Sequence, residues 1–349
     1  MNIMQSPTQA VVLAEKGLHV SLPDGRRSYF NYHWLRDNCP TSFSSVTRER
    51  SFDIFHLDRA PQPVAADLEG DDLVIRWRDE DHVSRLPLRM LGAFAGGVRR
   101  PDAADLPRRA WFADHYPNVA RFSQPELVAD PAKVAQWIEA LLVEGFAIVT
   151  DMPDSDEGLT RTARLLGQIR PTFFGRYFDV RTHINPTNTA YTAAALELHT
   201  DVPAEEHAPG VQFLHCRANT VEGGLSLYAD GVAVANEFRK VDPEGFRLLS
   251  EIDIPFYCEH DHYDMRARQV VIELDEKGEV SGLTISQHLL DVSDLPQELL
   301  DNWYPAFCQF GKLLRDPRFL MTFRMNGGEC MTFDNHRVVH GRAAYAASV

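Results

Sequence analysis

The chain has 349 residues and a formal net charge of −15, with 44% hydrophobic and 24% charged residues. These values are typical of a soluble globular protein with room for one large or two ordinary domains. The acidic balance argues against nucleic acid as a partner, because phosphate binding needs a basic face. No apolar run is long enough to span a bilayer, and residues 1–10 lack the pattern of a signal peptide. We therefore expect a cytoplasmic protein with no membrane partner.

The first quarter of the chain is typical of a small β-rich domain. Short runs of alternating residues are separated by turn residues, which predicts β-hairpins. A segment rich in Pro, Gly and Arg follows at Gly96–Pro107 and indicates a linker. Two hairpins are predicted, Gly17–Leu22 with Ser28–Tyr32 and Asp72–Trp77 with His82–Leu86. We expect three regions: a small domain over residues 1–98, a linker over 99–120 and a larger domain over 121–349.

The pattern beyond the linker mixes helices with strands. Asp130 is a predicted N-cap for a helix over Pro131–Val143, which ends at Gly145. Two further helices are predicted over Glu157–Ile169 and Pro296–Leu314. The remaining pattern predicts strands over Phe146–Val149, Gly210–Cys216, Gly224–Tyr228, Val270–Leu274, Val280–Ile285, Phe319–Arg324 and Cys330–Phe333.

These elements predict a mainly β fold with flanking helices. Many antiparallel strands favour a double-sheet jelly roll, which leaves few exposed sheet edges. The last two predicted strands, Phe319–Arg324 and Cys330–Phe333, are separated by the turn Asn326–Gly328. Such a turn is a strong hairpin signal, so we expect these two strands to pair with each other.

A candidate metal site lies in the second half of the chain. His199 and Asp201 stand two residues apart, so on an extended strand their side chains point to the same face. A histidine from a distant strand, His340, can complete three ligands. Two histidines and one carboxylate with open positions form the facial triad of non-heme Fe(II) oxygenases. The His-x-Asp pattern alone is a weak signal, because most such triplets are surface polar residues or buried histidines with protein partners.

Seven ordered motifs cover nearly the whole chain: Trp34–Pro40, Asn188–Tyr191, Leu198–Asp201, Pro209–Cys216, Gly223–Gly224, Asp230–Gly231 and Phe333–Arg342. Together they resemble the γ-butyrobetaine hydroxylase family, in the taurine-dioxygenase branch of the Fe(II)/2-oxoglutarate oxygenases. The resemblance implies a distorted double-stranded β-helix preceded by the small N-terminal domain. It also implies a homodimer that acts on a small molecule.

The same resemblance implies the roles of the metal-site residues. His199, Asp201 and His340 would hold Fe(II), and 2-oxoglutarate and O₂ would take the open positions. The enzyme would convert 2-oxoglutarate to succinate and CO₂ while it hydroxylates an unactivated carbon of the substrate. Ser226, on the strand after Gly223–Gly224, is a candidate contact for the 2-oxoglutarate carboxylate. An ordinary solvent-facing strand serine is an equal alternative.

Aromatic residues gather before the metal ligands: Phe173, Phe174, Tyr177, Phe178 and Tyr191. Single rings mostly belong to the core, but as a group these match the family's box for a quaternary ammonium. A trimethylammonium group donates no hydrogen bonds, so ring faces suit it, at about 0.5–2 kcal/mol per desolvated contact. We choose Phe174, Phe178 and Tyr191 as the box.

The anionic end of the substrate is less determined. Asn188 matches an Asn that the family uses on the substrate carboxylate, whereas Gln287 and His288 stand where a second Asn is usual. Arg176 and His183 offer further positive charge, although both can equally be solvated. A phosphonate needs more donors than a carboxylate. Two substrates are therefore equally compatible, 2-(trimethylammonio)ethylphosphonate and γ-butyrobetaine.

Two features depart from the family. Members carry an Arg about a dozen residues after the distal His, which pairs with the far carboxylate of 2-oxoglutarate. The chain stops at Val349, before that position, and we expect a further C-terminal segment rather than a substitution by Arg342. In the N-terminal domain, relatives build a zinc site from several Cys and a His. Here Cys39 has only His56 as a plausible partner, so we predict a metal-free domain and a buried thiol.

Two other classes of function use the same residues. A zinc hydrolase could bind its metal through the three ligands, although no general base stands beside them as in His-Glu-x-x-His enzymes. A catalytically inactive betaine-binding protein is the second alternative. The five scattered cysteines contain no Cys-x-x-Cys pair and indicate reduced thiols. Oxygen uptake that requires 2-oxoglutarate would separate the oxygenase from both alternatives.

Overall fold

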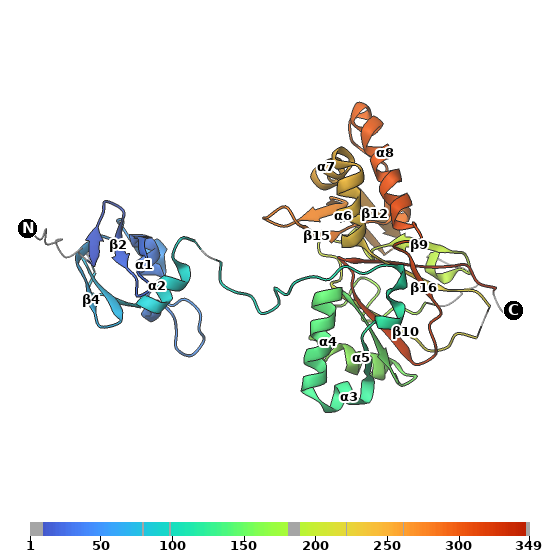
Figure 1. Cartoon of the computed structure of the whole chain (residues 1–349), viewed down its shortest axis with the longest axis horizontal. Coiled ribbons are helices and arrows are strands. Elements are labelled where there is room, and N and C mark those ends of the chain that lie inside the picture. Colours follow the sequence, from blue (N-terminus) through green and yellow to red (C-terminus); the bar gives the residue numbers. More distant parts are fainter. Residues whose placement is uncertain are drawn as a thin grey trace, which may run out of the picture. The chain divides into compact units, whose positions relative to one another are not determined.

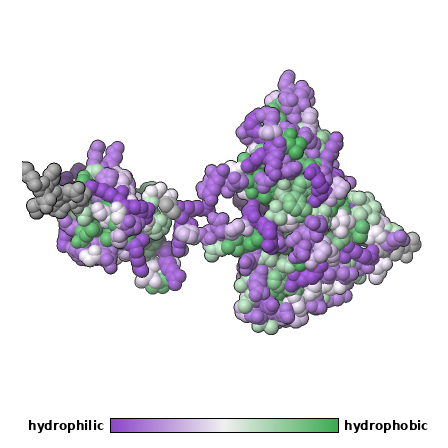
Figure 2. All heavy atoms as spheres, in the orientation of Figure 1, coloured by the Kyte–Doolittle hydropathy of each residue, from purple (hydrophilic) through white to green (hydrophobic). Residues whose placement is uncertain are grey.

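The chain forms two compact units, Met1–Ala103 and Ala104–Val349 (Figure 1). The boundary falls inside the predicted linker over 99–120. Trp111, near the end of that linker, is buried in the core of the second unit. Hydrophilic residues cover most of the visible surface of each unit, with smaller hydrophobic patches between them (Figure 2). The structure is a computed structural model that describes residues 10–78, 80–97, 99–180, 189–220, 222–260 and 262–346.

The first unit contains two three-stranded antiparallel sheets and two short helices. Both predicted hairpins are present, as β2–β3 and β5–β6. Alternate residues such as Leu18, Val20, Leu73 and Ile75 are buried in one core, as the period of two requires. The elements are β1 Val11–Leu13, β2 Gly17–Ser21, β3 Arg27–Asn31, α1 Tyr32–Asp37, β4 Pro63–Glu69, β5 Asp72–Trp77, β6 Val83–Pro87 and α2 Leu88–Phe94.

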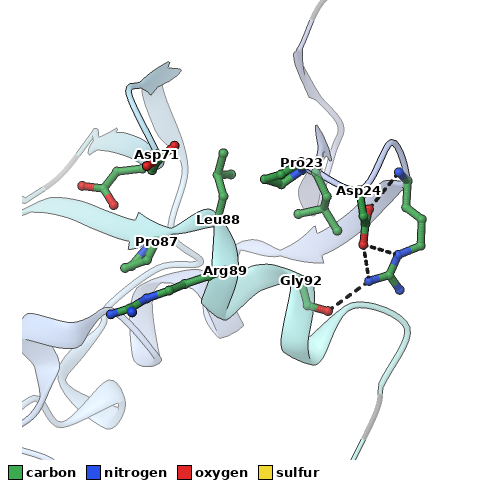
Figure 3. A pocket seen from close by; sticks show the side chains of 10 residues that line it. Pro23, Asp24, Asp71, Pro87, Leu88, Arg89 and Gly92 are labelled. Atoms are coloured by element: carbon green, nitrogen blue, oxygen red, sulfur yellow. Dashed lines mark hydrogen bonds and ion pairs between the residues drawn. The ribbon is translucent and has the colours of Figure 1, made fainter.

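Cys39 is fully buried, and its Sγ lies 3.2 Å from Thr41 Oγ1. His56, the only plausible partner that the sequence offered for a metal site, is exposed and lies 3.7 Å from Asp53 as an ion pair. Figure 3 shows a pocket on the surface of this unit, where Asp24 forms an ion pair with Arg26. This pocket contains none of the sequence-predicted site residues.

The second unit is built on two four-stranded sheets. In the first, β10 (Val211–Cys216), β17 (Glu329–Asp334), β8 (Phe146–Thr150) and β7 (Arg121–Ser123) lie in that order. In the second, the order is β16 (Met321–Phe323), β11 (Ser226–Asp230), β18 (Val338–Arg342) and β9 (Leu196–His199). Side chains from both sheets share one core, which includes Phe146, Tyr228, Phe323, Met331 and Phe333. The predicted mainly β fold with flanking helices is confirmed.

Helices cover the outer faces of both sheets. Helix α4 (Pro131–Glu144) packs Trp137 and Leu141 against the first sheet. It is capped by Asp130, whose side chain accepts the N–H of Ala132, and it ends at Gly145 with φ of 72°, as predicted. Helices α6 (Gly231–Val241), α7 (Pro243–Glu251) and α8 (Gln297–Leu314) pack together beside the second sheet (Figure 1).

Helices α6 and α7 were not predicted from the sequence, although their signals are present. Asp230 caps α6, and Asp242 caps α7 with Pro243 at its first position. The helix predicted over Glu157–Ile169 is shorter, because the backbone after Ala163 tightens into three-residue turns. The remaining elements are α3 Gln124–Ala129, α5 Asp156–Ala163, β12 Ile254–His260, β13 Tyr263–Gln269, β14 Ile272–Leu274 and β15 Val280–Leu283.

The predicted hairpin between the last two strands is wrong. Strand β16 pairs with β11, whereas β17 pairs with β10 and β8 in the other sheet. The turn Asn326–Gly328 therefore carries the chain from one sheet to the other, with Gly328 at φ of 84° donating its N–H to Cys216 O. Turn chemistry sets the local reversal but does not choose the sheet that each strand joins. No helix within the described ranges combines the length and apolarity needed to cross a membrane.

Candidate active site

The structure brings the three predicted metal ligands together on adjacent strands. His199 ends β9, Asp201 follows it by two residues, and His340 on β18 is the direct cross-strand partner of His199. His199 Nε2 lies 3.1 Å from Asp201 Oδ1, and His340 Nε2 lies 3.6 Å from Asp201 Oδ2. One ligand atom from each residue falls within a group no wider than 4.8 Å. Two imidazole nitrogens and one carboxylate oxygen fit Fe(II) with positions left open.

The two histidine rings lie in the core between the sheets. His199 Nδ1 donates to Glu197 O at 2.8 Å, which directs Nε2 towards Asp201 and the metal position. The ring of His340 packs against Phe333 and Tyr228, with centroid distances of 4.9 and 6.4 Å. Both histidines are buried. The site is therefore shielded from water on the side of the core.

Charge at the site suits a divalent cation. Burial opposes ionisation of Asp201, but the two neighbouring imidazoles outweigh it and hold the pKa of this carboxyl well below its ordinary value. Burial and the proximity of His199 lower the pKa of His340 to about 3. Burial also disfavours a charged His199, but its hydrogen bond to Asp201 raises the pKa of this imidazole. An ionised carboxylate and a neutral His340 are the forms that ligate a metal.

Two polar side chains that were missed in the sequence hold Asp201 in place. Asn335 Oδ1 accepts the N–H of Asp201 at 2.8 Å, and Asn335 Nδ2 donates to the carbonyls of Asp201 and Pro209. Gln212 Nε2 donates to Asp201 Oδ2 at 2.5 Å. Gln212 and Asn335 stand inside motifs that indicated the family, but nothing else in the sequence marked them as partners of Asp201. Their function depends on contacts between the two sheets.

Thr200 fixes the backbone between the first two ligands. Its N–H donates to Ile285 O at 2.7 Å, and its hydroxyl accepts the N–H of Ile285 at 3.0 Å. This pairing binds the end of β9 to the segment that follows β15. The backbone between His199 and Asp201 is therefore fixed to this neighbouring segment by two hydrogen bonds.

Ser226, the predicted 2-oxoglutarate contact, lies on the same sheet as the ligands. It is half-buried and directly opposite Arg342 on β18, just as Tyr228 is opposite His340. Cross-strand partners share a face of the sheet, so Ser226 and Arg342 share the face of the ligands. Arg342 donates to the carbonyls of Thr192 and Ala194 at 2.7 and 3.0 Å. This guanidinium group therefore anchors the backbone that leads into β9.

Of the three chosen box residues, Phe178 contacts both of the others. The ring centroids of Phe174 and Phe178 are 4.7 Å apart, and those of Phe178 and Tyr191 are 4.9 Å apart and nearly parallel. Phe173 extends the cluster to Tyr263, on β13, at 4.5 Å. Tyr263 was missed because it is a single aromatic residue on a hairpin that carries no motif. Tyr177 belongs to the same segment but is 53% exposed.

The residues chosen for the anionic head group are dispersed. Gln287 and His288 lie on a short 3₁₀ helix, Gln287–Leu289, and both are exposed. The ring of His288 is 5.1 Å from that of His199, so it lies beside the metal ligands. Arg176 is exposed and forms no hydrogen bond or ion pair with any other residue that the structure describes. Asn188 and His183 lie outside the described residues.

Comparisons with known proteins agree with this site. Residues 107–348 match the model of the "Taurine catabolism dioxygenase TauD, TfdA family". A γ-butyrobetaine dioxygenase of Pseudomonas sp. (strain AK-1) is 33% identical over 347 residues, which cover 97% of this chain and 90% of that protein. The γ-butyrobetaine dioxygenase of Homo sapiens is 30% identical over 93% of this chain and 86% of its own. A mitochondrial trimethyllysine dioxygenase of Bos taurus is 26% identical over 90% of this chain and 77% of its own.

Proposed function

The chain belongs to the TauD, TfdA family of Fe(II)- and 2-oxoglutarate-dependent dioxygenases, and we propose that it hydroxylates a small trimethylammonium zwitterion. It uses Fe(II), with 2-oxoglutarate and O₂ as co-substrates. His199, Asp201 and His340 are the residues that would hold the iron. When bound, the iron supplies the oxidising chemistry, in which 2-oxoglutarate yields succinate and CO₂ and one oxygen atom enters a substrate C–H bond. Membership of this family decides against the zinc hydrolase.

The observation that carries this proposal is the contact of Phe178 with both Phe174 and Tyr191, close in sequence to the predicted metal ligands. Only eight positions separate Tyr191 from His199. The backbone after Tyr191 is held by Arg342, which stands two residues beyond His340 on the same strand. The ring group is therefore anchored to the strand that carries a metal ligand. Ring faces are what a trimethylammonium group requires.

The relatives support this substrate class by their names. The dioxygenases of Pseudomonas and Homo sapiens are named for γ-butyrobetaine, and that of Bos taurus is named for trimethyllysine. Both compounds carry a trimethylammonium group, which these aromatic residues would bind while they exclude water from the reacting carbon. We assign Ser226 to the 2-oxoglutarate carboxylate, because it shares a sheet face with His340. We further propose that the two sheets form the family's double-stranded β-helix, and that the protein is a cytoplasmic homodimer.

Residues around the box offer donors for the anionic head group of the substrate. Arg176 has no protein partner within the described chain, and His288 lies beside His199, so both can supply donors to an anion. Two candidates remain, 2-(trimethylammonio)ethylphosphonate and γ-butyrobetaine. If Arg176, Gln287 and His288 bind a phosphonate, we expect the phosphonate to exceed γ-butyrobetaine by at least tenfold in kcat/KM, about 1.4 kcal/mol.

A coupled assay tests the proposal. The protein is incubated with Fe(II), O₂ and 2-oxoglutarate, and succinate is measured with each betaine and with an uncharged tert-butyl analogue as the control. We expect either betaine to stimulate succinate formation well above the analogue. Equal stimulation by the analogue would remove the trimethylammonium assignment. Arg176→Gln should reduce kcat/KM for the phosphonate more than for the carboxylate, and equal effects would remove Arg176 from the site.

A further inference from the structure

A side-chain hydrogen bond links the first sheet to the carboxylate of the predicted metal ligand Asp201. Gln212 lies on β10 of the first sheet, whereas Asp201 follows β9 of the second. The distance from Gln212 Nε2 to Asp201 Oδ2 is 2.5 Å. The other oxygen, Oδ1, lies 3.1 Å from His199 Nε2, whereas His340 Nε2 is farther away, 3.6 Å from Oδ2. The two oxygens of the carboxylate therefore have different neighbours.

The orientation of the Gln212 amide is fixed by its partner. The amide presents its donor end, Nε2, to Asp201 Oδ2, and a carboxylate that ligates a metal can only accept this hydrogen bond. The amide oxygen, Oε1, is then buried, and it has no hydrogen-bond partner among the described residues. A buried acceptor without a partner costs free energy, and a methionine would fill the same volume without that cost. Stability alone does not account for a glutamine here.

We propose that Gln212 is a positioning residue that keeps Asp201 monodentate towards the metal. The amide engages Oδ2, which leaves Oδ1, on the His199 side, as the oxygen that ligates. His199, Asp201 and His340 would then each offer one atom to the metal, which would leave open positions for 2-oxoglutarate and O₂. A bidentate Asp201 would take a further position. By holding Oδ2, Gln212 would keep Asp201 out of the metal position that O₂ needs.

Asn335 and Gln212 have separate tasks in this arrangement. The side chain of Asn335 bonds to backbone groups of Asp201 and Pro209, so it fixes the position of the Asp201 backbone. Gln212 bonds to the carboxylate itself, so it sets which oxygen is presented. Partners of this kind in other metal sites typically change metal affinity or activity by roughly 10–100-fold when they are removed. We expect Gln212 to fall in this range.

The test uses Gln212→Met, which keeps the volume but removes the donor, and Leu214→Ala as the matched control. Leu214 lies two residues along β10, packs against the core that both sheets share, and has no side-chain donor for a carboxylate. Mn(II) binding to the protein without substrate is measured by calorimetry. We expect Gln212→Met to weaken Mn(II) binding roughly 10–100-fold and Leu214→Ala to lower Tm with little change in binding. Mn(II) affinity like that of the wild type, or an equal loss in the control, would overturn the proposal.

A second readout separates positioning from a general loss of structure. In Gln212→Met, the KM for O₂ should rise more than the KM for 2-oxoglutarate, because a bidentate Asp201 would occupy the position that O₂ needs. Parallel changes in both constants would contradict the proposal. If Gln212→Met does not fold, Gln212→Asn serves instead. Its side chain is one methylene shorter, so the amide does not reach Asp201, and we expect the same loss of Mn(II) affinity and the same rise in the KM for O₂. Mn(II) binding needs no substrate, so the result does not depend on the substrate class proposed above.

Discussion

The metal side of the active site and its substrate side are built differently. The ligands His199 and His340 are buried partners on adjacent strands, and hydrogen bonds hold His199 and Asp201 in position. The candidate substrate residues lie on irregular segments and are half-buried or exposed, as Phe178 and Arg176 are. Strand pairing therefore fixes the positions of the predicted metal ligands, which supply the chemistry that the family shares. Side chains on loops, where replacement costs little stability, are free to set the substrate.

A buried ion pair strengthens the metal side further. Arg337 and Asp230 meet at 2.8 Å with almost no solvent exposure. Arg337 also donates to the carbonyls of Val143 and Arg109, while Asp230 accepts the N–H of Trp111. These contacts of Arg337 and Asp230 all join segments of the second unit. Arg337 stands three residues before His340 and directly before β18, so the pair fixes the start of the strand that carries this ligand.

Loss of a metal ligand should have the largest effect. His199→Ala, Asp201→Ala or His340→Ala should abolish turnover, because two remaining ligands do not hold Fe(II) in the required geometry. The matched control is His215→Ala on β10, which removes a partly buried histidine that is not part of the ligand group. Turnover is measured as succinate formed. A ligand variant that kept more than about a tenth of the wild-type rate, roughly 1.4 kcal/mol of barrier, would refute the triad.

Breaking the buried ion pair should have the next largest effect, on stability rather than on chemistry. Arg337→Met leaves the Asp230 carboxylate buried without its charge partner, which should cost about 3–5 kcal/mol of unfolding free energy. Arg247→Met on α7 is the control, because Arg247 pairs with Glu244 and Glu251 at the exposed surface. We expect thermal unfolding of this control to change little. Similar losses in both variants would show that the network around Arg337 is no stronger than a surface pair.

Changes to the aromatic box should have the smallest effect of the three. Phe178→Leu or Tyr191→Leu keeps apolar bulk but removes the ring face that attracts a cation. Binding of the trimethylammonium substrate should weaken by a factor of about three to thirty, as expected for the loss of one cation–π contact, while 2-oxoglutarate affinity is preserved. The tert-butyl analogue should lose little further affinity in these variants. Equal losses for the analogue and the cation would make these rings ordinary packing residues.

The same contrast explains what the sequence could and could not predict. His199 and Asp201 stand two residues apart in one motif, so their proximity was accessible before the fold was known, although β9 ends at His199 and Asp201 lies just beyond this strand. Gln212 and Asn335 were missed because their partners belong to a different sheet. The wrong hairpin around Asn326–Gly328 has the same cause, since the turn is local and the choice of sheet is not. Tyr263 reaches the aromatic cluster only through the β12–β13 hairpin, which no motif marked.

One measurement tests the proposed reaction most directly. The protein is incubated with Fe(II), 2-oxoglutarate, isotopically labelled O₂ and either betaine, and the products are examined by mass spectrometry. We expect one labelled oxygen atom in the hydroxylated betaine and one in succinate for each 2-oxoglutarate consumed. Consumption of 2-oxoglutarate without a labelled betaine product, or a hydroxyl oxygen derived from water, would contradict the assignment of this chain as a trimethylammonium hydroxylase.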